Sequence, residues 1–140
     1  MSVTGRTDVS DRDYAKLLRL RTRLREFEYW SAQQAAARGL TSAQHQLMLA
    51  VRGHKGDKPP TIGQIAGYLM IGHAAAVGLA DRTEALGLVC RHRDRDDHRI
   101  VRLTLTAVGA EKLAELTGAH LAELDHIEPL LAELYGDLNS

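Results

Sequence analysis

The chain has 140 residues, and its 18 Lys and Arg residues balance 18 Asp and Glu residues, so the formal net charge is zero at pH 7. This length suits one domain that buries its own core, and the single cysteine excludes an intramolecular disulfide. The sequence contains no apolar run of membrane-spanning length and no apolar signal stretch in residues 1–9, so we expect a cytoplasmic protein.

The neutral total hides an uneven distribution of charge along the chain. Residues 1–106 hold 17 Lys and Arg against 11 Asp and Glu, whereas residues 107–140 hold one Lys against seven acidic residues. A basic front part and an acidic back part suit a protein that presents one face to a polyanion.

The first expected element is a long helix over residues 11–38, preceded by a flexible tail at residues 1–10. Ser10 is a good N-cap with Asp13 at the N3 position, and Gly39 is a suitable terminator. A broad apolar face runs along this helix and includes Tyr14, Leu17, Leu18, Leu20, Leu24, Phe27 and Trp30.

Two shorter helices are expected next, and each begins with the spacing of a capping box. Thr41 and Gln44 start a helix that runs through Val51, and the tract 53–60 that follows is a loop. Thr61 and Gln64 start the next helix, whose apolar stripe consists of Ile62, Ile65, Ala66 and Leu69.

After a break at residues 71–72, the sequence predicts a further helix that ends before Gly87. At about 100° per residue, one side of this helix turns inward and comprises Ala76, Leu79, Ala80, Thr83 and Leu86. The outward side comprises Ala74, Gly78, Asp81, Arg82 and Ala85, so it carries few polar side chains.

Residues 88–106 predict a β-hairpin whose tip is rich in Arg and Asp. In the second strand, Val101, Leu103 and Leu105 alternate with Ile100, Arg102 and Thr104, and we expect Arg99 to open that strand. If residues 93 and 99 lie opposite each other, Cys90 pairs with Arg102. The alternative is a solvated loop whose ion pairs contribute little.

The acidic residues of the tip give its arginine a specific expected role. Carboxylates at Asp94, Asp96 and Asp97 can hold Arg99 extended by an ion pair, which leaves little rotamer entropy to lose when Arg99 meets a phosphate or a narrow minor groove.

The last expected helix starts after the cap residue Thr106, and Pro129 is expected to mark a restart. A small domain of three helices and a hairpin does not need long terminal helices, so the apolar faces of these helices require another partner. We expect the first and last helices to pair across a two-fold axis of a homodimer. The residues expected in that interface are Tyr14, Leu17, Leu18, Leu113, Leu116, His120, Leu130 and Leu134.

Helix, turn, helix and charged hairpin make a winged helix-turn-helix, and here the sequence resembles the MarR (multiple antibiotic resistance regulator) family. The resemblance covers roughly residues 11–140 and is most specific over residues 61–109. The residues that match the family pattern are Gly87, Leu88, Val89, Arg91, Asp94, Asp97, Arg99, Leu105, Thr106 and Gly109.

The resemblance implies a mainly α fold with a small β-hairpin wing. In this arrangement a winged helix-turn-helix lobe at residues 41–106 lies between dimerisation helices at 11–38 and 107–140. It also implies a ligand-responsive repressor that binds a pseudo-palindromic operator of double-stranded DNA, with the second helix in the major groove and the wing in an adjacent groove. The implied DNA contacts are His73, Ala74, Ala75, Gly78, Arg82, Arg91, Arg93, Arg95, Asp97 and Arg99.

One departure from the family shapes this expectation. The family commonly presents Ser, Thr or Arg where this chain has Ala74, Ala75 and Gly78, so few donors face the base edges. Alanine can contact a thymine methyl, and specificity is then expected to depend on the wing and on DNA shape.

The resemblance also implies a small lipophilic or aromatic effector, bound where the terminal helices meet the lobe. Tyr29, Trp30 and His45 lie on elements that would line such a junction, although packing in the core or in an interface explains the same residues.

Two alternatives from other classes remain open. The chain could be a winged-helix protein-interaction module with weak or no DNA binding, or a regulator that responds to oxidation of Cys90. An enzyme is not expected because the sequence has no phosphate loop, nucleophile elbow or paired acids, and its histidines form no tight metal motif. We therefore expect no metal and no cofactor.

Overall fold

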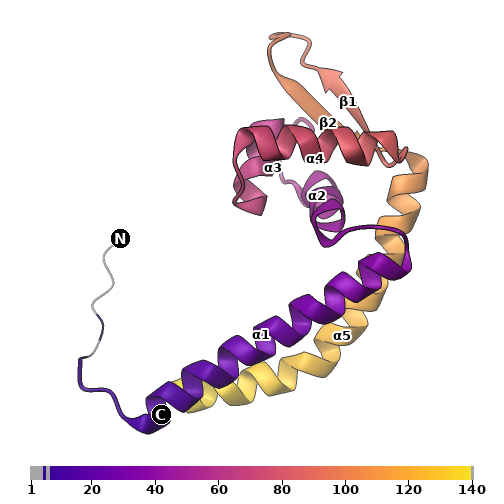
Figure 1. The fold of residues 1–140 in the computed structure, drawn as a ribbon. Helices are drawn as coiled ribbons and strands as arrows, with labels where there is room; N and C mark the ends of the chain where they lie inside the picture. The colour runs from indigo at the N-terminus through magenta and orange to yellow at the C-terminus, as the bar shows by residue number, and fades with distance from the viewer. Residues whose placement is uncertain (1–4, 6, 140) are drawn as a thin grey trace. The chain divides into compact units, whose positions relative to one another are not determined.

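The computed structural model describes residue 5 and residues 7–139, without the side chains of residues 134, 135 and 137–139. Within these residues the chain forms five helices and one hairpin (Figure 1). The elements are α1 (Asp11–Ala37), α2 (Ser42–Gly53), α3 (Ile62–Leu69), α4 (His73–Ala85), β1 (Val89–Arg93), β2 (Val101–Leu105) and α5 (Ala107–Asn139). The expected mainly α fold with a hairpin wing is confirmed.

The helices begin at the hydroxyl residues that the sequence marks as caps. The amide of Gln44 donates to Thr41 Oγ1 at 3.1 Å, and the amide of Gln64 donates to Thr61 Oγ1 at 3.0 Å. Both glutamine side chains accept from the cap amide in return, which completes two capping boxes. The same type of contact starts α1 at Ser10 with Asp13, and α5 at Thr106 with Gly109.

The chain divides into two compact units, which are described separately. The helical unit comprises Met1–Ser31 and His120–Ser140, and the lobe comprises Ala32–Ala119. The lobe extends beyond the expected residues 41–106 because its core includes Ala35 from α1 and Leu113 and Leu116 from α5.

This core changes part of the expected dimer interface. Leu113 is 3% exposed and Leu116 is fully buried, both inside the lobe of a single chain. Their spacing of three residues therefore reflects packing within the chain, and we remove both from the expected interface. The side chain of Leu134 lies outside the described residues.

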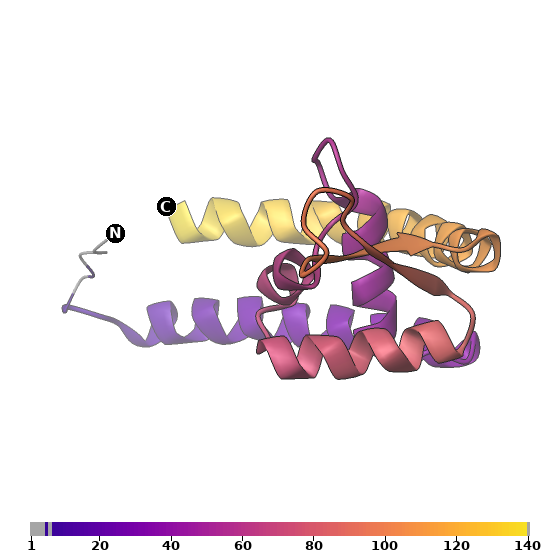
Figure 2. The same ribbon diagram turned by 90° about the horizontal axis from the view of Figure 1, so that it is seen from above.

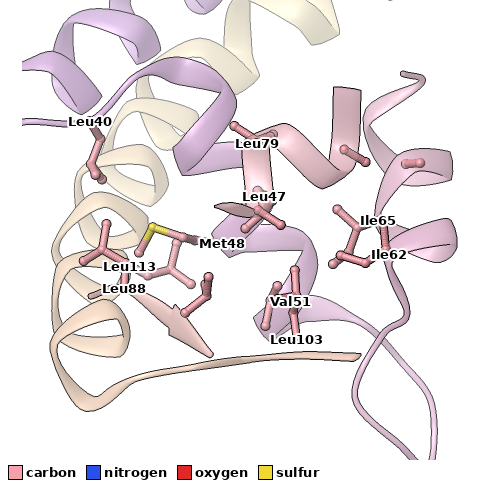
Figure 3. Close-up of a cluster of buried hydrophobic side chains, with 14 of the residues drawn as sticks. Leu40, Leu47, Met48, Val51, Ile62, Ile65, Leu79, Leu88, Leu103 and Leu113 are labelled. Atoms are coloured by element: carbon pink, nitrogen blue, oxygen red, sulfur yellow. The ribbon is translucent and has the colours of Figure 1, made fainter. Parts of the chain in front are cut away.

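The lobe packs α2, α3, α4 and the hairpin around one apolar cluster (Figure 3). Leu47 of α2, Ile65 of α3 and Leu103 of β2 are fully buried. Full burial of one such side chain contributes about 1.5–3 kcal/mol, so the wing is attached to the helices by packing as well as by hydrogen bonds.

The two helices of the helix-turn-helix are short and meet at a sharp break. None of the described helices is by itself long and apolar enough to cross a membrane. The α3–α4 pair, which is bent by 104° at the break, reaches the length and hydropathy of a membrane span only when its two helices are counted together. Ala76, Leu79, Ala80 and Thr83 of α4 are buried as expected. Leu86 was expected to face inward but is 52% exposed, because α4 ends at Ala85 and Leu86 is its C-cap.

The hairpin register differs from the expected one by two residues. Arg93 pairs with Val101, so Cys90 lies opposite Thr104, and His92 lies opposite Arg102. The loop spans residues 94–100 and is closed by a hydrogen bond from the Asp94 amide to the Ile100 carbonyl at 2.9 Å. Arg99 therefore lies in the loop and does not open the second strand.

Helix α5 continues through Pro129, so the expected restart there is wrong. A proline inside a helix removes one backbone hydrogen bond, but the turns on either side still form here. In the helical unit α5 contacts α1 through His120, whose ring lies 4.8 Å from Trp30 and 5.9 Å from Phe27 between centroids. The side chain of Ser31 approaches His120 Nε2 at 2.6 Å.

Candidate nucleic-acid interface

The candidate interface consists of α4 and the wing, which lie next to each other in the lobe. Figure 2 shows the hairpin running beside α4, with the loop that follows α2 near the hairpin tip. His73, Ala74 and Ala75 are exposed at the start of α4, as the expected DNA contact requires. The described residues therefore place the helix start and the wing on one connected surface.

Arg82 changes the character of the outward face of α4. A Cβ built on Gly78 would lie 3.2 Å from Arg82 Nη1, which shows that the guanidinium folds back over Gly78. The outward face of α4, which carries few polar side chains, therefore has the Arg82 cation lying over Gly78, its smallest residue. The four-residue spacing of Gly78 and Arg82 is the signal for this contact.

Arg99 and Asp97 form a two-pronged ion pair in the hairpin loop. Arg99 Nε donates to Asp97 Oδ1 at 3.0 Å, and Nη2 donates to Oδ2 at 2.9 Å. The amide of Arg99 also donates to Asp97 Oδ1 at 3.1 Å. These bonds lower the pKa of Asp97 and raise that of Arg99. The Arg99 side chain stays 90% exposed, so its orientation is fixed while its charge faces solvent.

Asp94 organises the rest of the loop from a buried position. Its carboxylate accepts from Arg102 Nε at 2.7 Å and from the amides of Asp96 and Asp97 at 3.0 Å each. The hydrogen bond from Arg102, followed by those from the amides, holds the pKa of Asp94 well below its usual range. Because Asp94 accepts hydrogen bonds from two amides of the turn, residues 94–97 belong to the loop. The strands therefore pair only from Arg93 and Val101 onward, which is the observed register.

The loop between α2 and α3 is attached to the wing through the same carboxylate. Lys58 Nζ lies 3.5 Å from Asp94 Oδ1 and 3.2 Å from Asp96 Oδ2, and Arg102 Nη1 donates to the Pro59 carbonyl at 2.7 Å. Sequence reasoning missed Arg102 because the assumed register placed it opposite Cys90, away from Asp94, and it missed Lys58 because this residue precedes Asp94 by 36 positions in another loop.

Arg91 was expected to contact DNA, but the structure directs its guanidinium to α4. Its Nε and Nη2 donate to Glu84 Oε1 at 3.1 and 2.8 Å, and Nη1 bonds Asp81. The amide of Arg91 donates to Glu84 Oε2 at 2.9 Å. These bonds lower the pKa of Glu84, and the hydrogen bond from the Arg91 amide has the largest effect. Arg91 thus forms a clasp between the wing and α4, and its expected contact with DNA stays a prediction.

The remaining wing arginines differ in their surroundings. Arg93 Nη1 donates to the His98 carbonyl at 2.7 Å and so supports the loop, whereas Arg95 is exposed within it.

A hollow of about 390 Å³ lies between the hairpin and the helix-turn-helix. Its lining residues are Thr61, Ile62, Gly63, His73, Val77, Arg91, Arg99, Ile100 and Val101.

The residues expected to bind an effector fall in different units. Tyr29 is 68% exposed and Trp30 is half-buried in the helical unit, where Trp30 stacks with Phe27 at 6.0 Å between centroids. His45 is 4% exposed within the lobe. Their joint role in a pocket stays a prediction.

The MarR family model matches residues 38–100, which include the helix-turn-helix, β1 and the wing loop. No curated protein sequence matches the chain significantly.

Solved structures with the same fold cover nearly the whole chain. AbsC from Streptomyces coelicolor, described as a MarR family transcriptional regulator, is 17% identical with a TM-score of 0.73, over 94% of this chain and 99% of that one. YusO from Bacillus subtilis is 21% identical with a TM-score of 0.67, over 94% and 98%. A mutant of S. aureus MepR, solved bound to an oligodeoxyribonucleotide, is 20% identical with a TM-score of 0.67 over 94% and 98%.

Proposed function

We propose that the chain, whose residues 38–100 match the MarR family model, is a member of that family and a homodimeric DNA-binding regulator, a ligand-responsive repressor acting at a pseudo-palindromic operator. The observation that carries the proposal is Arg99, which is held by both oxygens of Asp97 and is 90% exposed at the wing. A guanidinium held in this way loses little rotamer entropy when it binds a phosphate or enters a minor groove.

In this proposal α4 enters the major groove. Ala74 and Ala75 contact thymine methyl groups, and Arg82 adds a cation over Gly78. The wing lies against the sugar-phosphate backbone, where Arg95 and Arg99 are accessible. The oligodeoxyribonucleotide-bound S. aureus MepR, which shares the fold, supports DNA as the partner.

The proposed dimer is supported by the apolar side chains that the helical unit leaves exposed. Tyr14 is 64%, Leu17 51% and Leu18 63% exposed on α1, and Leu130 is 36% exposed on α5. His120 contributes less to such an interface, since its ring contacts Trp30 and Phe27 within the chain.

The decisive experiment compares Arg99→Ala and Asp97→Ala by fluorescence anisotropy on DNA from the chain's own promoter region. Arg99→Ala should weaken binding on the order of tenfold and reduce the salt slope by about one contact per subunit. Asp97→Ala should also weaken binding, although it removes a negative charge, because Arg99 loses its support. Arg12→Ala, an exposed arginine in α1, is the matched control.

Two outcomes would contradict the proposal. Tighter binding by Asp97→Ala would show that Asp97 only repels DNA and does not orient Arg99. Absence of any promoter binding by the parent would instead favour a protein-interaction module.

We further propose that a lipophilic or aromatic acid weakens DNA binding by favouring a dimer with wrongly spaced wings. A coupling of about 1–3 kcal/mol is enough for such a switch. Trp30 is the only tryptophan in the chain, so quenching of its fluorescence reports binding near Tyr29 and Trp30 directly. If oxidation of Cys90 changes DNA binding and no such compound does, the signal is redox chemistry at Cys90 and the proposal of a lipophilic or aromatic effector is wrong.

A further inference from the structure

The hairpin has a hollow on each of its two faces. Successive residues of a strand point to opposite faces, so Arg91 and Val101 share the face turned to α4, and their neighbours His92 and Arg102 share the other. Arg91 and Val101 line the hollow of about 390 Å³ beside α4, which we call the inner hollow. His92 and Arg102 line a second hollow of about 330 Å³, which we call the outer hollow.

Two loops that are distant in sequence form the outer hollow. Lys58 comes from the loop between α2 and α3, and Arg95 comes from the wing loop, which Figure 2 shows near it. The backbone next to Lys58 is fixed to the wing, because the Pro59 carbonyl accepts from Arg102 Nη1 at 2.7 Å and Thr61 forms a β-bridge with Arg102. Lys58 therefore keeps a defined position relative to the wing loop.

The lining of the outer hollow is cationic on balance. It includes four Lys and Arg side chains but only two carboxylates. Asp94 is 6% exposed and is already neutralised by Arg102 and two amides within the lobe. Asp96 is 85% exposed and accepts from Lys58 Nζ at 3.2 Å. Positive charge thus remains for an anion that enters from solvent.

Lys58 and Arg95 have donors left for such an anion. An ammonium group carries three N–H donors, and Lys58 Nζ directs two of them toward Asp94 at 3.5 Å and Asp96 at 3.2 Å. Arg95 is exposed, and no hydrogen bond or ion pair within the described residues engages its guanidinium. A phosphodiester offers two charged oxygens, which suits one donor from each side chain.

We propose that the outer hollow binds a backbone phosphate of DNA through Lys58 and Arg95, on the strand opposite to the one that Arg99 meets from the inner hollow. This site rests on the proposed DNA binding and adds a contact from the loop between α2 and α3, outside the wing. A minor groove is about 6 Å wide, and its walls are the phosphates of the two strands. A hairpin tip placed in that groove has one wall on each face, so cations on both faces act together.

A phosphate of DNA suits this hollow better than a free anion does. Asp94 and Asp96 reduce the attraction for an ion that must bind by itself. A phosphate of bound DNA is delivered by the other contacts of the lobe, so its effective concentration at Lys58 is high and a weak site is sufficient.

The test neutralises phosphates one at a time. Duplexes from the chain's own promoter region carry a single methylphosphonate linkage, and fluorescence anisotropy measures their affinity for the full-length parent. Linkages on both walls of the minor groove should weaken binding. In Lys58→Met and Arg95→Ala, neutralising one wall should have no further effect, and in Arg99→Ala neutralising the other wall should have none. Lys58→Met and Arg95→Ala should each weaken binding to unmodified DNA about fivefold and reduce the salt slope by about one contact per subunit.

Controls separate a phosphate contact from support of the wing loop. Lys58→Met removes the ion pairs with Asp94 and Asp96, so it could act by loosening the loop. Lys58→Arg keeps the charge and should bind within about twofold of the parent. Arg95→Ala removes no contact within the described residues, and its effect therefore reports the phosphate. Arg12→Ala, in α1, should bind like the parent.

Failure of this site differs from failure of the proposed function. If Lys58→Met and Arg95→Ala bind DNA like the parent, or respond to the same linkages as Arg99→Ala, the outer site is overturned while DNA binding stands. Binding of inorganic phosphate to the parent that is lost in Arg95→Ala, with an unchanged response to every linkage, would replace DNA by a free anion and also overturn it. A parent that binds no promoter DNA would overturn the proposed function and this site together.

Discussion

Replacement of Gly109 by alanine should destabilise the protein, although alanine is the better helix former. Gly109 lies in the first turn of α5, and a Cβ there would lie 2.0 Å from the Leu88 carbonyl oxygen and 2.9 Å from its carbon. The obstructing atoms are backbone, and the same oxygen accepts the Thr106 amide at 3.0 Å. The start of α5 and the residue before β1 must therefore separate by about 1.4 Å or more to reach ordinary van der Waals contact.

The expected magnitude follows from two opposing terms. Alanine gains about 1 kcal/mol over glycine in a helix interior, whereas overpacking that moves backbone costs about 1–3 kcal/mol and sometimes more. For a clash of 2.0 Å with backbone we take the upper part of that range. Gly109→Ala should thus lower the free energy of unfolding by about 2 kcal/mol.

Gly118→Ala provides a matched control in the same helix. A Cβ at Gly118 has no atom of the described residues within 4 Å, so this variant should gain about 0.5–1 kcal/mol. Urea unfolding followed by circular dichroism measures both, at one protein concentration because dimerisation shifts apparent stability. If Gly109→Ala unfolds at the parent's midpoint or above it, the close approach of α5 to β1 is wrong.

Two further predictions concern the wing and the helix-turn-helix. Asp94 has a pKa held below its usual range by Arg102 and two amides, so its stabilisation is present above about pH 4, the unfolded value, and is lost as the pH falls through the folded value. Asp94→Asn should melt below the parent at pH 7, and a difference that does not shrink between pH 4 and pH 3 would contradict this origin. Met70→Gly should raise the free energy of unfolding by about 1 kcal/mol, because Met70 has a left-handed φ of 57° and is 91% exposed. Urea unfolding tests it with Met70→Ala as the control, and a loss of stability would show that the Met70 side chain makes a contact.

The sequence predicts well what depends on neighbouring residues. The capping boxes at Thr41 and Thr61, and the terminating glycines with φ of +76° at Gly39 and +75° at Gly87, follow from local chemistry. The ion pair of Asp97 and Arg99 follows for the same reason, since only one residue lies between its members.

Features that depend on distant residues were not predictable in this way. The hairpin register depends on the hydrogen bonds of the Asp94 carboxylate, and alternation of apolar residues is equally satisfied by a shift of two. Helical spacing at Leu113 and Leu116 shows that they are buried but does not say whether the chain or its partner buries them. The role of Arg91 depends on carboxylates one turn apart on α4.

The clasp formed by Arg91 has a consequence for attempts to redesign specificity. Asp81 and Glu84 belong to α4, and both bond a wing residue, so the helix and the wing are not independent modules. A helix grafted from a relative without these two acids would leave the Arg91 charge unneutralised beside α4 and remove an acceptor of its amide. Exchange of binding specificity by helix grafting should therefore succeed only when residues 81, 84 and 91 are transferred together.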